Sequence, residues 1–352
     1  MENDGLIKKN IKEKIKKYNY GLAFLKSILA FTVLISHNFN NNSTKNKIIL
    51  FITKNRKTHV PSFFILSFYF SCNNLLSLNI KNFLKRIIRL LLPYIIWPVI
   101  VLKINYLFNL IHKKKLLSDD YQSLKIQLLW GRRYMNQFWF QWNLIATTIL
   151  FYSIILIIRK HCLFIFLLLL IFSYISQYSG YYYNNCYMKY APHKRYTIAR
   201  MYEVIPFAVT GFIIGFYKVM KIIQNIQIKT FIISIIVYNA VKDYKIFSDI
   251  RGVSFYGIHL NIQSICLIFI FSLFPLNNIK NNYLKRFINI ILNYSAGIYY
   301  LHVSIHNYLK FDFNVFKDGT FLCIIINYII CCCICHIGML FFSQSPLKYL
   351  FC

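Results

Sequence analysis

The chain has 352 residues, of which 57% are hydrophobic, 18% aromatic and only 14% charged, and its mean hydropathy is +0.48. Soluble domains carry about 25% charged residues, and a soluble core in a chain of this length cannot bury so much apolar surface. The composition therefore excludes soluble globular and disordered proteins, and it predicts an all-α membrane protein.

The formal charge of +31 is distributed along the chain, because the 41 Lys and Arg residues are spread through short polar segments. Nucleic-acid binding requires a compact basic patch or domain, so no nucleic-acid partner is expected. Attraction to anionic membrane lipids is the simpler prediction. Most of the ten cysteines lie inside apolar runs, where they act as small hydrophobic residues and not as a disulfide framework.

The chain begins with a polar segment, residues 1–19, which contains six lysines and predicts a cytosolic tail. Apolar runs then predict a transmembrane bundle of about ten spans over residues 20–343, and residues 344–352 form a short C-terminal tail. Ten spans place both termini on the same side of a multi-pass membrane protein. The expected spans are 20–38, 60–78, 87–111, 138–158, 162–178, 200–217, 230–241, 252–275, 287–309 and 320–343.

Lys26 and His37 interrupt the first apolar segment, and helical spacing predicts that they share one face. Eleven residues at about 100° each make three turns plus roughly 20°, which separates the two side chains by about 16 Å along the axis. Ionisable groups at membrane depth usually face the bundle interior or a wet cavity. Each residue alone also fits an interfacial position near lipid headgroups, but the common face favours a functional pair.

A basic run from Lys85 to Arg89 precedes the main part of the third apolar segment. Arg86 and Arg89 are three residues apart at the expected start of a helix, so both can point at one anion. The alternative is a stop-transfer anchor in which these cations meet lipid phosphates.

The order of these motifs resembles that of the acyltransferase family 3 membrane proteins, which include sugar O-acetyltransferases. Lys26, ten intervening residues and His37 stand where the family has Arg, ten residues and His. The family motif VPLFFxLSG is matched by Val60–Ser67, followed by Phe68 in place of Gly. Lysine keeps the positive charge but lacks the guanidinium fork, and Phe68 removes a point of close helix approach.

Further motifs extend the resemblance over about residues 20–310, in the family's order. They are the basic pair Arg86 and Arg89, the following Pro93-Tyr94, the aromatic start Trp139–Leu144 of the fourth segment, and Tyr300–Val303 near the end.

The resemblance implies an integral-membrane O-acyltransferase. Its co-substrate is acetyl-CoA or another acyl-CoA, its acceptor is a hydroxyl of a carbohydrate or lipid-linked molecule, and no cofactor stays bound. Arg86 and Arg89 are expected to bind the donor phosphates. His37 is expected to act as general base or as transient acyl carrier, and Lys26 to stabilise an oxyanion or hold a phosphate.

Three more residues belong to the matched motifs and are expected to bind substrate: Ser67, Trp139 and His302. His302 has an alternative role in interfacial packing. No metal site is expected, because the histidines have no neighbouring carboxylate and consecutive cysteines at 331–333 point in different directions on a helix.

A multi-pass transporter or lipid-handling protein without catalysis is the alternative function. Against it, the sequence shows no inverted repeat and almost no acidic residue inside the expected spans, with Glu203 the exception.

Overall fold

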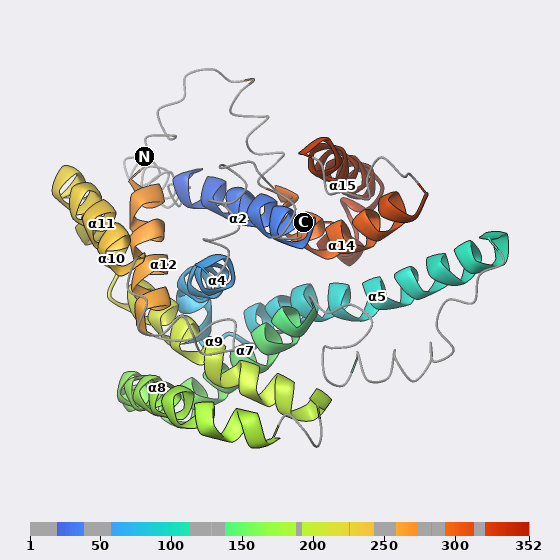
Figure 1. The fold of residues 1–352 in the computed structure, drawn as a ribbon. Helices are drawn as coiled ribbons and strands as arrows, with labels where there is room; N and C mark the ends of the chain where they lie inside the picture. Colours follow the sequence, from blue (N-terminus) through green and yellow to red (C-terminus); the bar gives the residue numbers. More distant parts are fainter. Residues whose placement is uncertain are drawn as a thin grey trace, which may run out of the picture.

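The computed structural model describes residues 20–38, 58–112, 128, 138–187, 192–224, 226–242, 258–273, 283, 293–312 and 321–351. These residues form α-helices and two short 3₁₀ helices, and the described part of the chain contains no strand. Figure 1 shows the arrangement. The helices are α2 (Tyr20–Asn38), α4 (His59–Leu76), α5 (Ile80–His112), α7 (Phe138–Ile157), η2 (Arg159–His161), α8 (Cys162–Tyr187), α9 (Pro192–Phe216), α10 (Val219–Gln224), α11 (Gln227–Lys242), α12 (Ile258–Ser272), α14 (Ser295–Asp312), α15 (Phe321–Phe342) and η6 (Pro346–Leu350).

Each of the ten predicted segments overlaps a helix, and the all-α prediction is confirmed for the described part of the chain. Three helices are long and apolar enough to cross a membrane, over Ile80–Ile104, Phe138–Ile157 and Leu322–Phe342. Four further helices contain shorter apolar stretches of 10–17 residues. Membrane crossing by the other helices stays a prediction. The predicted cytosolic tail, residues 1–19, lies outside the described residues.

Helix α4 lies in the middle of the bundle and contacts α2, α5, α7, α9 and α12 (Figure 1). Its closest neighbour is α9, which brings two glycines against it. A Cβ on Gly211 would overlap the backbone of Ile65, and one on Gly215 would lie 2.6 Å from the Cβ of Cys72. The close approach between helices that Phe68 was expected to prevent on α4 is therefore supplied by α9.

Phe68 itself contributes to an aromatic core between α4, α7, α8 and α9. Its ring centroid lies 4.8 Å from that of Phe151, which is 4.4 Å from that of Phe166, and Phe166 is 4.6 Å from Phe212. All four side chains are fully buried. Aromatic pairs at these distances add about 0.5–1.5 kcal/mol each beyond their buried area, so the core tolerates a large side chain at position 68.

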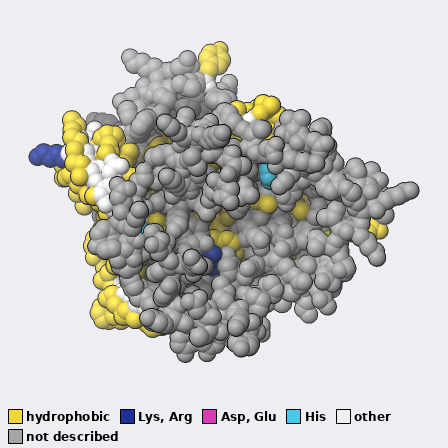
Figure 2. All heavy atoms as spheres, in the orientation of Figure 1, with side chains coloured by type: hydrophobic (Ala, Val, Ile, Leu, Met, Phe, Trp, Pro, Cys, Tyr) yellow, Lys and Arg dark blue, Asp and Glu magenta, His cyan; other side chains and the backbone are white. Residues whose placement is uncertain are grey.

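Large apolar side chains also cover the outside of the bundle. Ile228 and Ile236 of α11 are 77% and 61% exposed, and Phe172 and Ile175 of α8 are 57% and 59% exposed. Figure 2 shows apolar side chains along the edge where α11 and α8 lie in Figure 1. Large exposed apolar side chains gathered along one edge are typical of a face that contacts lipid or a partner.

Candidate functional site: a basic pocket

A cavity of about 430 Å³ opens between α2, α4, α5, α7 and α14. Four cationic side chains line it, Lys26 from α2 and Lys85, Arg86 and Arg89 from α5. No carboxylate is among the lining residues, and Glu203 is the only acid in the chain whose side chain the structure describes. We call this cavity the basic pocket. Its charge favours an anionic ligand.

Neutral polar and aromatic side chains complete the wall of the basic pocket. Hydroxyl and amide groups come from α4, the start of α5, α7 and α14, and apolar side chains fill the spaces between them. The lining comprises Ser67, Ser71, Asn74, Asn82, Gln141, Ser295, Tyr299 and Tyr300, with Phe63, Phe70, Leu90, Phe140, Leu144 and Ala296.

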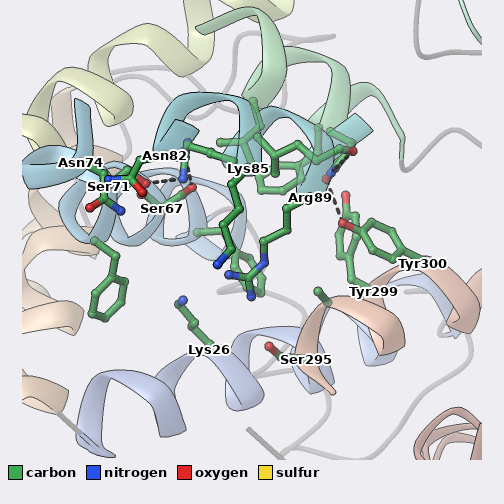
Figure 3. Close-up of a pocket in the computed structure, with 18 residues that line it drawn as sticks. Lys26, Ser67, Ser71, Asn74, Asn82, Lys85, Arg89, Ser295, Tyr299 and Tyr300 are labelled. Atoms are coloured by element: carbon green, nitrogen blue, oxygen red, sulfur yellow. Dashed lines mark hydrogen bonds between the residues drawn. The ribbon is translucent and has the colours of Figure 1, made fainter. Parts of the chain in front are cut away.

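Helical spacing explains why three cations of α5 face the same cavity. Lys85 and Arg89 are four residues apart, and Arg86 lies three residues before Arg89, so all three belong to neighbouring positions on one side of the helix. Figure 3 shows the side chains of Lys85 and Arg89 descending from α5 toward Lys26, which rises from α2. The amino group of Lys26 also lies 4.5 Å from the ring centroid of Phe70.

Arg86 is held by three hydroxyl groups from two other helices. Its Nη2 donates to Ser67 Oγ at 3.0 Å, its Nη1 donates to Ser71 Oγ, and its Nε donates to Thr148 Oγ1 at 3.3 Å. A guanidinium has five N–H groups, so three are used to join α5 to α4 and α7. Two N–H groups of Arg86 have no hydrogen-bond partner among the described residues and are available to a ligand.

Arg89 and Lys85 are less constrained than Arg86. Both side chains are exposed, and neither makes a hydrogen bond with a described residue. The guanidinium carbon of Arg89 lies 5.6 Å from the ring centroid of Tyr349 in η6. These two cations therefore present most of their donors to the cavity.

Next to Arg89 in the pocket wall, Gln141 of α7 connects α5 and α14. Its Nε2 donates to the carbonyl oxygen of Leu90 at 2.7 Å, and its Oε1 accepts from the hydroxyl of Tyr300 at 3.1 Å. The ring of Tyr300 stacks on Phe138 with centroids 5.6 Å apart. These contacts hold the Gln141 and Tyr300 side chains in place, and none of them involves a cation of the basic pocket.

Four of the predicted site residues, Lys26, Ser67, Arg86 and Arg89, line the basic pocket. The other three predicted residues lie elsewhere or cannot be placed. His37 belongs to the last turn of α2, and its side chain is outside the described residues.

Trp139 and His302 are both buried and are not among the pocket-lining residues. The guanidinium carbon of Arg200 lies 4.9 Å from the Trp139 ring centroid, and Arg200 is paired with Glu203 at 2.6 Å. His302 Nδ1 lies 3.1 Å from the carbonyl oxygen of Ile298, and its ring is 5.9 Å from that of Tyr299.

Sequence reasoning did not single out several residues of the pocket. Lys85 could have been predicted, because its spacing of four residues from Arg89 places both side chains on one helix face. Ser71 follows Ser67 by four residues and shares its face in the same way. Gln141 lies inside the matched motif Trp139–Leu144 but was not predicted as a site residue, and Tyr299 gave no sequence signal. The roles of both depend on how α7 and α14 pack against α5.

No protein-family model, curated protein or solved structure matches the chain. Chemical interpretation of the basic pocket therefore depends on its geometry. Arginine forks and lysine ammonium groups bind phosphate and carboxylate oxygens, and they do so more strongly in a partly enclosed site than in water. The arrangement can hold an anion that carries several negative charges.

Proposed function

We propose that the protein is an integral-membrane, multi-pass O-acyltransferase of ten spans with a cytosolic N-terminus. It transfers an acyl group, in the first place acetyl, from acyl-CoA to a hydroxyl of a carbohydrate or lipid-linked acceptor. The observation that carries the proposal is the convergence of Lys26, Lys85, Arg86 and Arg89 on one cavity, with no carboxylate among the described residues that line it. Coenzyme A carries a pyrophosphate and a 3′-phosphate at the end remote from its thioester, and these groups match such a cavity.

Arg89 and Lys85 would make the main contacts to the donor phosphates, because their donors are not engaged by described side chains. Arg86 would add its two remaining N–H groups from a fixed position. Lys26 shares the cavity with these cations, which favours phosphate binding over the stabilisation of an oxyanion.

The reacting end of the donor would lie farther along α2. His37 follows Lys26 by eleven residues, which corresponds to about 16 Å of helix, so a long arm must separate the bound phosphates from the thioester. The pantetheine arm of CoA provides such a separation. A ligand whose anionic and reacting groups are adjacent does not meet this requirement.

In the transfer step, the acceptor oxygen attacks the thioester carbonyl carbon while its proton passes to the His37 imidazole. The C–S bond then breaks, and the CoA thiolate takes up the proton, which gives the ester and free CoA. Trp139 and His302 stay candidates for the acceptor side, where an aromatic face and a buried imidazole suit a sugar ring. Ser67 acts by holding Arg86.

The test uses purified protein in lipid nanodiscs with acetyl-CoA as the only substrate. Without an acceptor, water replaces the hydroxyl slowly, so release of free CoA should be detectable with a thiol reagent. His37→Ala should reduce this rate by about 10²–10⁴-fold, as loss of a general base does. The matched control is His161→Ala, because His161 is exposed at the end of η2, directly before α8, and its replacement should be silent.

An active His37→Ala enzyme would remove the catalytic assignment. Binding of CoA without any hydrolysis by the wild-type protein would favour the transporter or lipid-handling alternative. Absence of CoA binding would refute both the donor site and the acyltransferase proposal.

A further inference from the structure

The C-terminal residues after α15 are packed onto the bundle beside the basic pocket. Ser345 begins η6 by accepting a hydrogen bond from the Leu347 backbone N–H at 3.2 Å. The indole Nε1 of Trp97 in α5 donates to the carbonyl oxygen of Leu350 at 3.0 Å. Leu350 and Phe351 are buried. We call residues 343–351 the C-terminal segment.

Two glycines make room for the last described residue of this segment. A Cβ on Gly338 of α15 would overlap the ring of Phe351, and a Cβ on Gly297 of α14 would lie 2.7 Å from its carbonyl oxygen. The Phe351 ring is stacked on Phe342 with centroids 5.9 Å apart and meets Trp97 edge to face at 5.8 Å. The segment is therefore attached to α5, α14 and α15 by independent contacts.

This attachment places Tyr349 against a cation of the basic pocket. The guanidinium carbon of Arg89 lies 5.6 Å from the Tyr349 ring centroid, and the amino group of Lys348 lies 5.8 Å from the same centroid. Tyr349 does not line the cavity itself. Its ring attracts the Arg89 side chain, which is otherwise exposed and has no hydrogen bond to a described residue.

We propose that Tyr349 is a positioning residue that holds the Arg89 guanidinium at the basic pocket, so that the C-terminal segment sets the affinity of the pocket for its anion. An aromatic face restricts the Arg89 side chain without neutralising it, which leaves the guanidinium donors available. The proposal deepens the proposed function, but it requires only that the basic pocket binds an anion.

The test measures binding of inorganic pyrophosphate by calorimetry to the purified full-length protein in detergent. Tyr349→Leu keeps most of the apolar volume and removes the aromatic face, whereas Tyr349→Phe keeps the face. Tyr349→Leu should weaken binding roughly two- to fivefold, and Tyr349→Phe should bind like wild type. Tyr106→Leu is the matched control, since Tyr106 is an exposed tyrosine of α5 that does not line the pocket.

A double-mutant cycle separates positioning from a general structural effect. If Tyr349 acts through Arg89, Tyr349→Leu should have no further effect on pyrophosphate binding in an Arg89→Ala background. An equal loss in both backgrounds, a loss in Tyr349→Phe as large as in Tyr349→Leu, or no pyrophosphate binding by wild type would each overturn the proposal.

The acetyl-CoA assay is independent of this cycle. A protein that shows the predicted coupling for pyrophosphate but neither binds nor hydrolyses acetyl-CoA would support the role of Tyr349 and refute the proposed acyltransferase function.

Discussion

Arg86 and Arg89 occupy one helix face, yet the structure predicts different consequences for their loss. Arg86 joins three helices through Ser67, Ser71 and Thr148, whereas Arg89 makes no hydrogen bond to a described residue and lies over the Tyr349 ring. Replacing each by methionine removes the charge and keeps a flexible apolar stem. Arg86→Met should therefore lower both anion affinity and stability, and Arg89→Met should lower anion affinity alone.

The expected loss in free energy of unfolding for Arg86→Met follows from the three hydrogen bonds of Arg86. A hydrogen bond to a charged group contributes about 1.5–3 kcal/mol, but neighbouring contacts do not add fully. Two of the hydroxyls keep backbone partners after the change, because Ser71 Oγ donates to the Ser67 carbonyl at 2.5 Å and Thr148 Oγ1 to that of Leu144 at 2.7 Å. The oxygens of Ser67, Ser71 and Thr148 lose the donor that Arg86 provided, but the hydroxyls of Ser71 and Thr148 stay anchored through the hydrogen bonds that they donate. The cost for Arg86→Met should therefore be about 3 kcal/mol in total, below the sum of three separate charged hydrogen bonds.

Arg89→Met loses one cation–aromatic contact of about 0.5–1 kcal/mol, and relief of repulsion from the other three cations offsets that loss. Thermal unfolding of the purified proteins in one detergent measures the difference. Arg86→Met should unfold several degrees below wild type, and Arg89→Met within a degree or two of it. Equal unfolding temperatures, or a larger drop for Arg89→Met, would refute the assigned roles.

Two further changes test the pocket and the bundle. Lys26→Met should raise the KM for acetyl-CoA roughly 10- to 100-fold, because it removes a charged contact to the donor. Lys26→Arg keeps the charge and should keep activity. An unchanged KM in Lys26→Met would exclude Lys26 from donor binding. Gly211→Ala should destabilise the bundle by about 1–3 kcal/mol, because the new methyl group overlaps the backbone of Ile65. An unfolding temperature of Gly211→Ala at or above that of wild type would contradict the described α4–α9 contact.

The helices could be predicted because continuous apolar runs in a chain of this composition have few other stable forms. Their ends were harder to predict. Helix α9 begins at Pro192, eight residues before the expected start at 200, and its first turns read His193-Lys194-Arg195. Hydropathy detects only the apolar part of a helix, whereas polar turns continue the backbone hydrogen bonds without an apolar signal. Proline in the first turn is favourable, since its missing N–H would have no partner there.

The candidate site was predictable in part for a related reason. Helical spacing places Arg86 and Arg89 on one face, and it also fixes Lys26 relative to His37. Spacing within a helix cannot tell which helices meet, and the convergence of α2 and α5 on one cavity depends on their packing around α4. The C-terminal segment illustrates the limit, because its polar residues suggested a short tail, yet Trp97 and Gly338 attach it to the bundle.

The aromatic content of the chain bears directly on how four cations coexist in the basic pocket. Three of them lie over rings, Lys26 over Phe70 at 4.5 Å, Arg86 over Phe68 at 5.4 Å and Arg89 over Tyr349 at 5.6 Å. A carboxylate at any of these positions would neutralise its cation and remove much of its attraction for a ligand. Aromatic faces and hydroxyl oxygens stabilise the cations by smaller amounts and leave their charge in place. The basic pocket is therefore stabilised well enough to fold, while most of its positive potential is left for an incoming anion to neutralise.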